Sequence, residues 1–352
     1  MTQRQLDLLK QLVLCPSPSG FEKEIAGLIQ KQIPNGSRNV VVDFQNNVMV
    51  NIPGKTNNCV MIDAHLDQVG FIVSNIDEHG QISLLSIGGV DSSIMSNKNL
   101  VILTERGPVN AVVNRKAAHL VEYESDESIE HTYEALVDIG IRGFKKVSKV
   151  VQIGDPVVYK PTFEHLYDQY YTGNGLDDKV GCFVLIETIR NIVHLSEKPF
   201  HTLVFTFSSQ EETNGRKCRP LIKRFKPSVF IEVDVTFATD WDEKSWDSEK
   251  QVGRCVLGKG PVLYRGVDID RDCFAFLKRG AKKADTMVQV QASTGDIGYT
   301  ATEVTNESRG VRGMIVGLPL RNMHSSVEIV NTRDLTDAIK LLTKSLLTRS
   351  LI

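Results

Sequence analysis

Two adjacent glutamates, Glu211 and Glu212, directly follow the short apolar segment 203–207, where Ser208, Ser209 and Gln210 separate them from it. The segment is rich in β-branched and aromatic residues, which is typical of a buried strand. In an open α/β sheet, chemistry collects at the carboxyl ends of the strands. Consecutive side chains of an extended segment point to opposite sides, so the two carboxylates cannot face one partner in the same way. One could bind a metal ion while the other holds a proton, although a solvated acidic turn is the commoner role of such a pair.

Four other side chains of metal-binding type lie where an apolar segment ends or in a glycine-rich loop: His65, Asp177, Asp234 and His324. The carboxyl edge of one sheet would gather all of them with Glu212. Two imidazoles, two aspartates and one glutamate are ligands that suit a pair of zinc-like ions. Two ions about 3.5 to 4 Å apart need one carboxylate that bridges them, and an adjacent glutamate can supply the base.

The composition bounds the class of protein. The 352 residues are 41% hydrophobic and 24% charged, as in a globular protein long enough for two domains. The formal net charge of -2 does not favour nucleic acid or an anionic membrane as a partner. No apolar run approaches the roughly 20 residues of a membrane span, and the N-terminus lacks a signal-peptide pattern. Six scattered cysteines without CxxC spacing favour reduced thiols, so we expect a soluble, cytoplasmic protein.

Strand-like and helical segments alternate at both ends of the chain, which is typical of an α/β domain. The expected strands near the candidate site are 59–64, 203–207, 229–233 and 314–318, the third of them ending just before Asp234. An amphipathic helix over 334–347 closes the chain. The middle differs, because short strand-like runs alternate with turns from about residue 68 to 160. Such spacing indicates a small β-barrel or sandwich inserted into the α/β domain. We therefore predict a discontinuous catalytic domain, residues 1–66 and 162–352, and an inserted β-rich domain, residues 67–161.

Several short motifs resemble those of the M42 family of metal-dependent aminopeptidases, the tetrahedral cytosolic peptidases. The matching motifs are Asp63-Ala64-His65-Leu66-Asp67, Gly175-Leu176-Asp177-Asp178-Lys179, Gln210-Glu211-Glu212, Glu232-Val233-Asp234 and Arg321-Asn322-Met323-His324-Ser325. Each motif alone is weak, but they keep the family order and cover nearly the full length. The resemblance implies a mixed-sheet zinc-peptidase fold, phosphorylase/hydrolase-like, with a PDZ-like insert for dimerisation. It also implies six dimers in a hollow tetrahedral dodecamer, which would restrict substrates to short unfolded peptides.

The resemblance implies roles for the five candidate ligands. His65 and Asp234 resemble the ligands of one metal ion, and Glu212 with His324 those of the other. Asp177 occupies the position that bridges them. Two divalent ions per subunit follow, and zinc is the expected metal. Cobalt and manganese are alternatives, because ligands of this type accept all three metals.

The resemblance also implies two catalytic roles. Glu211 matches the general base that takes the proton of a metal-bridged water, and that water attacks the first peptide carbonyl. Asp67 matches a carboxylate that orients the ligand His65, which fixes the imidazole tautomer. Asp178 is expected to support the loop and not to bind metal.

Other functions fit part of the pattern. A related dinuclear amidohydrolase or deacylase would use similar ligands, and a catalytically silent assembly protein would have lost a ligand, whereas every position here is filled. The preferred N-terminal residue stays open, because Arg321 could favour acidic side chains or could brace its loop. Gln68 and Thr213-Asn214 depart from the common family pattern, and this leaves the shape of the substrate pocket in doubt.

Overall fold

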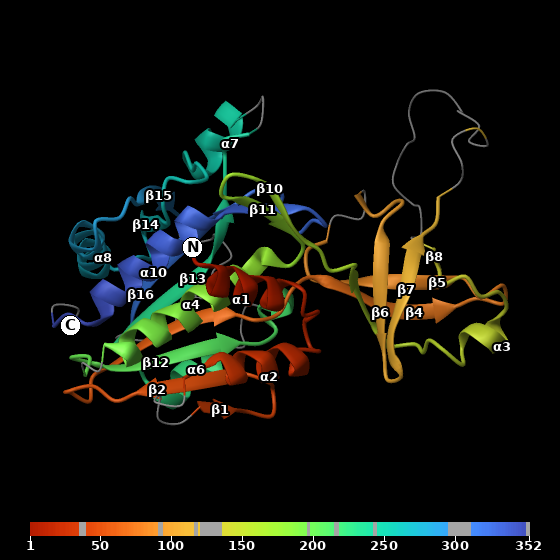
Figure 1. The fold of residues 1–352 in the computed structure, drawn as a ribbon, viewed down its shortest axis with the longest axis horizontal. Coiled ribbons are helices and arrows are strands. Elements are labelled where there is room, and N and C mark those ends of the chain that lie inside the picture. Colours follow the sequence, from red (N-terminus) through yellow and green to blue (C-terminus); the bar gives the residue numbers. More distant parts are fainter. Residues whose placement is uncertain are drawn as a thin grey trace.

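The computed structural model describes residues 1–34, 40–90, 94–115, 119, 136–195, 198–214, 218–241, 245–294 and 311–349. An eight-stranded mixed sheet flanked by helices forms the larger part, and a closed barrel lies to one side of it (Figure 1). The predicted mixed-sheet α/β fold with an inserted barrel is confirmed at this level. Each part has a hydrophobic core of its own.

The large sheet has the strand order β1-β2-β12-β3-β13-β16-β14-β15. In that order the strands span Val40–Val42, Val48–Ile52, Thr202–Ser208, Cys59–His65, Val229–Phe237, Arg312–Leu320, Val262–Gly266 and Gln289–Ser293. Strands β12, β3, β13 and β16 are parallel, whereas β2 is antiparallel to β12 and β14 is antiparallel to β16. The four parallel strands are buried along almost their whole length, which accounts for their nearly continuous apolar sequences. Their carboxyl ends meet at one edge of the sheet.

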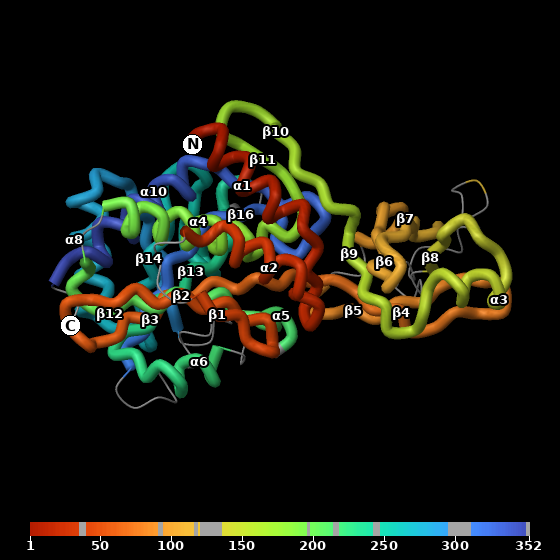
Figure 2. Tube along the Cα trace, turned by 60° about the horizontal axis from the view of Figure 1, so that its bottom comes forward, coloured from red at the N-terminus to blue at the C-terminus, as the bar shows by residue number. Residues whose placement is uncertain are grey.

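Helices cover both faces of this sheet. Helix α4 (Leu176–His194) packs on β3 and β13, α10 (Thr332–Leu346) on β16, and α8 (Arg271–Ala284) on β14. Helix α6 (Cys218–Phe225) packs against β3 from the side opposite to α4 and α10 (Figure 2). The described residues also form helices α1 (Gln3–Val13), α2 (Lys23–Gln32), α3 (Phe144–Val147), α5 (Glu211–Asn214) and α7 (Ser245–Val252).

The inserted part is a closed barrel in the order β4-β5-β8-β7-β6-β9. Its strands span Gly70–Ile76, Ile82–Ile87, Val137–Asp138, Gly107–Val113, Asn99–Thr104 and Pro156–Tyr159. Strand β8 was not expected, because two residues are too few to produce an alternating sequence pattern. A third, smaller sheet joins β10 (Phe163–Tyr167), β11 (Tyr170–Gly173) and β17 (Glu328–Asn331). Strand β11 directly precedes α4 in the chain. Strand β17, from near the other end of the chain, pairs with β11 and therefore lies close to the start of α4.

The prediction that a strand ends just before Asp234 is wrong. Strand β13 continues to Phe237, because it stays paired with β16 as far as Leu320. Its pairing with β3 on the other side stops at Glu232. Asp234 therefore lies inside a strand, but beyond the point where one neighbouring strand has ended.

All six cysteines lie in the described ranges, and each is a free thiol. Among the described residues, no helix has the length and apolar character that a membrane crossing requires.

Candidate active site

The carboxyl edge of the parallel strands brings the candidate residues together. His65 is the last residue of β3 and pairs with Ser208, the last residue of β12, so Glu211 and Glu212 leave the sheet beside it. Asp177 comes from the first turn of α4, which packs on β3 and β13. His324 comes from the loop after β16, the strand next to β13.

The Asp177 carboxylate lies between two imidazoles. Its Oδ1 is 3.0 Å from His65 Nε2, and its Oδ2 is 3.2 Å from His324 Nε2. Burial alone would raise the pKa of this carboxyl, but the hydrogen bonds from His324 and His65 hold the pKa well below its usual range. One carboxylate with each oxygen toward a different imidazole has the arrangement of a group that bridges two cations.

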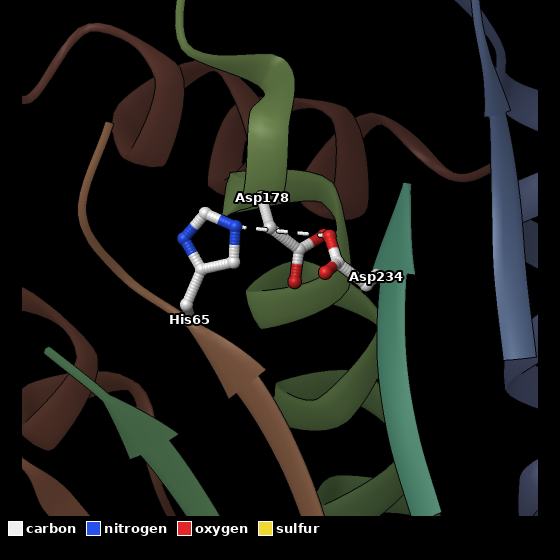
Figure 3. A group of neighbouring side chains, drawn as sticks. All are labelled: His65, Asp178 and Asp234. Atoms are coloured by element: carbon white, nitrogen blue, oxygen red, sulfur yellow. Dashed lines mark ion pairs between the residues drawn. The ribbon is translucent and has the colours of Figure 1, made fainter. Parts of the chain in front are cut away.

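A first group of ligand atoms gathers around His65. His65 Nε2 lies 3.7 Å from Asp234 Oδ1, and ligand atoms of His65, Asp178 and Asp234 all lie within 4.8 Å of one another (Figure 3). Asp178 supports its loop as expected, since its Oδ1 accepts a hydrogen bond of 3.0 Å from Gly181 N–H. Its Oδ2, however, is buried without a hydrogen-bond partner among the described residues. Asp178 therefore also belongs to the carboxylates that a cation at this point would meet.

A second group gathers around His324. Its Nε2 lies 3.3 Å from Glu212 Oε2, while Glu212 Oε1 is buried and has no hydrogen-bond partner among the described residues. His324 Nδ1 lies 2.9 Å from the carbonyl oxygen of Gly89, which follows barrel strand β5. A carbonyl oxygen only accepts, so Nδ1 carries the proton and Nε2 is the atom available for a metal. The sequence offered no signal that a backbone group near the barrel would set this tautomer.

Asp67 contacts both sides of the site. Its carboxylate accepts hydrogen bonds from the backbone N–H groups of Glu211, at 3.0 Å, and Glu212, at 3.1 Å. His65 Nδ1 lies 3.1 Å from the Asp67 carbonyl oxygen and 3.5 Å from the carboxylate. The carbonyl is thus the nearer partner of the imidazole, and the carboxylate mainly fixes the two glutamates where α5 begins.

Negative charge is in excess at this edge. Burial raises the pKa of Glu211 well above its ordinary value, and Asp234 and Asp67 raise it further against the opposing effect of His65. Burial also raises the pKa of Asp234 to about 7. Burial lowers the pKa of His324, but its hydrogen bonds to Asp177 and Glu212 outweigh this and raise the pKa to about 11. Such shifts arise where buried carboxylates outnumber the cations that could balance them.

Glu328, in β17, is a site residue that the sequence did not reveal. Its Oε2 accepts hydrogen bonds from Leu176 N–H at 2.7 Å and Asp177 N–H at 3.4 Å, and its Oε1 accepts one from His324 N–H at 2.9 Å. The side chain is buried, and burial with the nearby Asp177 raises its pKa to about 8. One carboxylate therefore holds the backbone of two candidate ligands. No motif surrounds Glu328, so only the pairing of β17 with β11 could have indicated its position.

Arg321 and Gln68, whose roles the sequence did not decide, have defined hydrogen-bond partners in the structure. Arg321 donates from Nε and Nη2 to the two carboxylate oxygens of Asp240, each at 2.8 Å. A bidentate pair of this kind supports the loop-bracing role, because it neutralises the guanidinium charge. Gln68 Oε1 accepts hydrogen bonds from Lys179 Nζ and from Ser17 N–H. Gln68 is therefore a buried support beneath the Asp177 loop.

Gly181 in α4 allows the Asp178 carboxylate to lie against the helix. A Cβ at this position would collide with that carboxylate. We expect Gly181→Ala to lower the free energy of unfolding by about 1–3 kcal/mol, as overpacking of a dense interior does. Urea denaturation measures the change. Gly27→Ala in α2 is the matched control, because nothing lies within 4 Å of the added Cβ, and it should stabilise by about 0.5–1 kcal/mol. Equal effects of the two changes would contradict this account of Gly181.

The chain is similar to known aminopeptidases over nearly its full length. The family model described as M42 glutamyl aminopeptidase matches residues 46–341. A lysyl aminopeptidase of Pyrococcus furiosus is 29% identical over 341 residues, which cover 95% of this chain and 94% of that protein. A TET aminopeptidase structure from a marine sediment Thaumarchaeota archaeon matches with a TM-score of 0.91 at 25% identity, covering 99% of this chain and 98% of that one.

A further solved structure is that of the TET1 peptidase of Pyrococcus horikoshii, described as able to assemble into a tetrahedron or a large octahedral shell. It matches with a TM-score of 0.86 at 24% identity and covers 98% of this chain and 100% of that one. At this identity the likeness establishes the fold alone.

Proposed function

Because this chain belongs to the M42 family and is therefore an aminopeptidase, a hydrolase, we propose that it uses two divalent metal ions to remove N-terminal residues from short peptides. In this proposal His65 and Asp234 would hold one ion. Glu212 and His324 would hold the other, and the Asp177 carboxylate would be shared between the two. The observation that carries the proposal is the Asp177 carboxylate, whose two oxygens lie 3.0 and 3.2 Å from two different imidazoles.

The residues fit a pair of metal ions on two further grounds. Glu212 Oε1 and Asp178 Oδ2 are buried oxygens without hydrogen-bond partners among the described residues, and a buried carboxylate oxygen is costly unless something pairs with it. The donors are imidazole nitrogens and carboxylate oxygens, the set that zinc accepts. The surplus of buried negative charge would be balanced by divalent cations. Zinc is the metal we propose, with cobalt or manganese as alternatives.

The chain's own groups then have separate tasks. Bound divalent ions supply Lewis acidity, which makes a water more acidic and a peptide carbonyl more electrophilic. Glu211 accepts the proton of the attacking water and returns it to the leaving amine, as a general base and then a general acid. Its raised pKa without metal reflects burial among carboxylates, and added positive charge would lower that pKa toward a value suited to a base. The Asp67 carboxylate fixes the backbone of both glutamates, because it accepts hydrogen bonds from the N–H groups of Glu211 and Glu212.

The quaternary structure is part of the same proposal. We propose that the inserted domain, residues 67–161, is a PDZ-like dimerisation domain and that the dimers form a tetrahedral dodecamer. The likeness in fold to the TET1 peptidase, which assembles into a tetrahedron or an octahedral shell, supports this. A cytoplasmic location is proposed with it, and the six free thiols are consistent with a reducing compartment.

Metal analysis with a substrate panel tests the proposal. We expect about two ions per chain and hydrolysis of aminoacyl anilides but not of N-acylated amino acids. Cleavage of substrates with blocked N-termini would instead favour the amidohydrolase or deacylase alternative. A protein that binds no metal and cleaves neither class would favour the silent assembly protein.

The pH dependence of metal binding is a separate expected result. The pKa values of His65 and His324 are raised, and that of Asp234 is about 7, so these groups carry protons near neutral pH when no metal is bound. A metal must displace those protons, so its affinity should fall as the pH falls from 8 to 6. Calorimetry in buffers of different ionisation enthalpy measures the protons released. Binding with no proton release would contradict the assignment of these ligands.

A further inference from the structure

Two carboxylates hold the backbone of the turn that carries Glu211. The Asp67 carboxylate accepts the N–H groups of Glu211 and Glu212. The N–H group of the preceding residue, Gln210, donates to Glu22 Oε1 at 3.2 Å. Glu22 reaches this turn from the position just before α2. Three consecutive N–H groups therefore end on carboxylates, and the role of Asp67 alone does not account for the first of them.

Gln210 has a backbone conformation that needs such an anchor. Its φ is 58°, in the left-handed region, which is unfavourable for a residue with a Cβ. This conformation changes the direction of the chain between the end of β12 and the start of α5, directly before Glu211. It therefore sets the direction in which the Glu211 side chain leaves the backbone. Without an acceptor for the Gln210 N–H, the turn would relax toward an ordinary conformation and carry Glu211 with it.

The Glu22 carboxylate is itself held rigidly. The side chain is fully buried, and its Oε1 accepts a second hydrogen bond, from Gly20 N–H at 2.6 Å. Its Oε2 is also buried and has no hydrogen-bond partner among the described residues. All the hydrogen bonds that the described residues make to this carboxylate therefore converge on the one oxygen that faces Gln210.

The same segment of the chain also contacts the other end of the turn. Ser19 Oγ lies 3.2 Å from Thr213 Oγ1, in α5 (Figure 2). Ser19 N–H donates to the carbonyl oxygen of Gln68, the residue after Asp67, at 3.1 Å. Residues 19–22 thus meet the turn both before and after its two glutamates. Thr213 departs from the common family pattern, and its hydroxyl supplies this contact.

We propose that Glu22 is a positioning residue for the general base, because it fixes the backbone of Gln210 and thereby the direction of the Glu211 carboxylate. The inference rests on the proposed function, since it takes Glu211 to be the base. Glu22 has no contact with substrate or metal in this proposal. Its removal should displace Glu211 and leave the metal ligands in place, because Asp67 still holds the backbone of Glu212. A displacement of 1 Å is enough to lower a rate by about 100-fold.

Kinetic constants of zinc-loaded variants test this on an aminoacyl anilide. Glu22→Ala should lower kcat about 10- to 100-fold, with KM and metal content within about twofold of those of the unmodified protein. Glu22→Gln should restore nearly full kcat, because its carbonyl oxygen can replace Oε1 and no hydrogen bond of Oε2 is lost. Unchanged kcat in Glu22→Ala would overturn the inference.

Asp270→Ala is the matched control. The Asp270 carboxylate also accepts two backbone N–H bonds, at 3.0 and 2.9 Å, at the start of α8. Asp270 N–H donates to Gly313 O near the start of β16, so this residue lies at the edge of the sheet opposite to the candidate site. The change should leave kcat as it is.

A double variant separates positioning of the base from a purely structural role. Protein with Glu211→Gln has no base to position, so adding Glu22→Ala should change its kcat by less than about twofold. A loss by the same factor in both backgrounds would overturn the inference and leave the proposed function standing. Near-normal turnover in Glu211→Gln alone would instead show that the proposed function has the wrong base.

Hydrogen exchange adds a measurement that does not depend on activity. In the zinc-loaded protein, amides of peptides covering residues 209–213 should exchange about tenfold faster in Glu22→Ala than in the unmodified chain. Unchanged exchange there would overturn the inference whatever the turnover. If Glu22→Ala does not fold, Glu22→Asp takes its place in both assays, because it keeps the charge but withdraws the oxygens by about one C–C bond, ~1.5 Å. The same outcomes then decide.

Discussion

Glu211→Gln is expected to lower kcat by about three orders of magnitude, within the range that a positioned general base contributes. The amide has nearly the same shape as the carboxylate but cannot accept the proton of a water. The backbone N–H of residue 211 would still donate to Asp67, so the loop and the neighbouring Glu212 should keep their positions. Metal content and the unfolding midpoint should therefore stay close to those of the unmodified protein.

The measurement is kcat on an aminoacyl anilide, together with metal analysis of the same preparation. Glu24→Gln is the control, because Glu24 is an exposed carboxylate on α2 and should leave kcat unchanged. Near-normal turnover in Glu211→Gln would remove Glu211 as the base. Loss of metal in that variant would move Glu211 into the ligand set.

Glu328→Ala is expected to weaken metal binding by about 10- to 100-fold, as the loss of groups that orient metal ligands does. Three backbone N–H groups lose their acceptor in this variant, and two of them belong to Asp177 and His324. The loops that carry these ligands would no longer be held to each other. We expect turnover under limiting metal to fall with the affinity and to recover in part when the metal concentration is raised.

Titration with a competing chelator measures the affinity, and two variants make the result specific. Glu328→Gln keeps the shape but turns a donor toward one of the N–H groups, so it should show an intermediate loss. Asp334→Asn changes another buried carboxylate that accepts two backbone N–H bonds, from Gly258 and Gly260, each at 2.7 Å. It should destabilise the fold and leave the metal affinity unchanged. An unchanged affinity in Glu328→Ala would show that Glu328 serves only the fold.

The parts of the fold that follow from local sequence were predictable. The central strands are nearly continuous apolar runs because both of their faces are buried, and such runs are visible without a structure. The barrel was predictable from short strand-like runs between turns. The end of β13 was not, because β16 extends it to Phe237 by pairing that no local pattern encodes.

The residues that position the site depend on contacts between distant segments. Glu328 reaches Asp177 and His324 because β17 pairs with β11, across a sequence separation of 152 residues for the bond to Leu176. Arg321 could bind substrate or brace its loop as far as the sequence was concerned. Its bond to Asp240, 81 residues away, supports the second role. Glu22 lies 188 residues before Gln210 in the chain, and only the packing of the N-terminal segment against the turn after β12 brings its carboxylate to the Gln210 N–H group.

By itself, the sequence determined the family, the mixed α/β class and the seven residues of the candidate site, because each motif is local and lies near the end of a strand or at the start of α4. Only the tertiary structure decided which partner each of these side chains has. In the structure Asp177 lies between two imidazoles, and the nearest partner of His65 Nδ1 is the Asp67 carbonyl oxygen instead of its carboxylate. Asp178 lies with His65 and Asp234 in the first group of ligand atoms. The physical reason is that hydrogen bonds and ion pairs depend on the distance between atoms in space. These distances are fixed only when strands from the two halves of the chain pair side by side in one sheet.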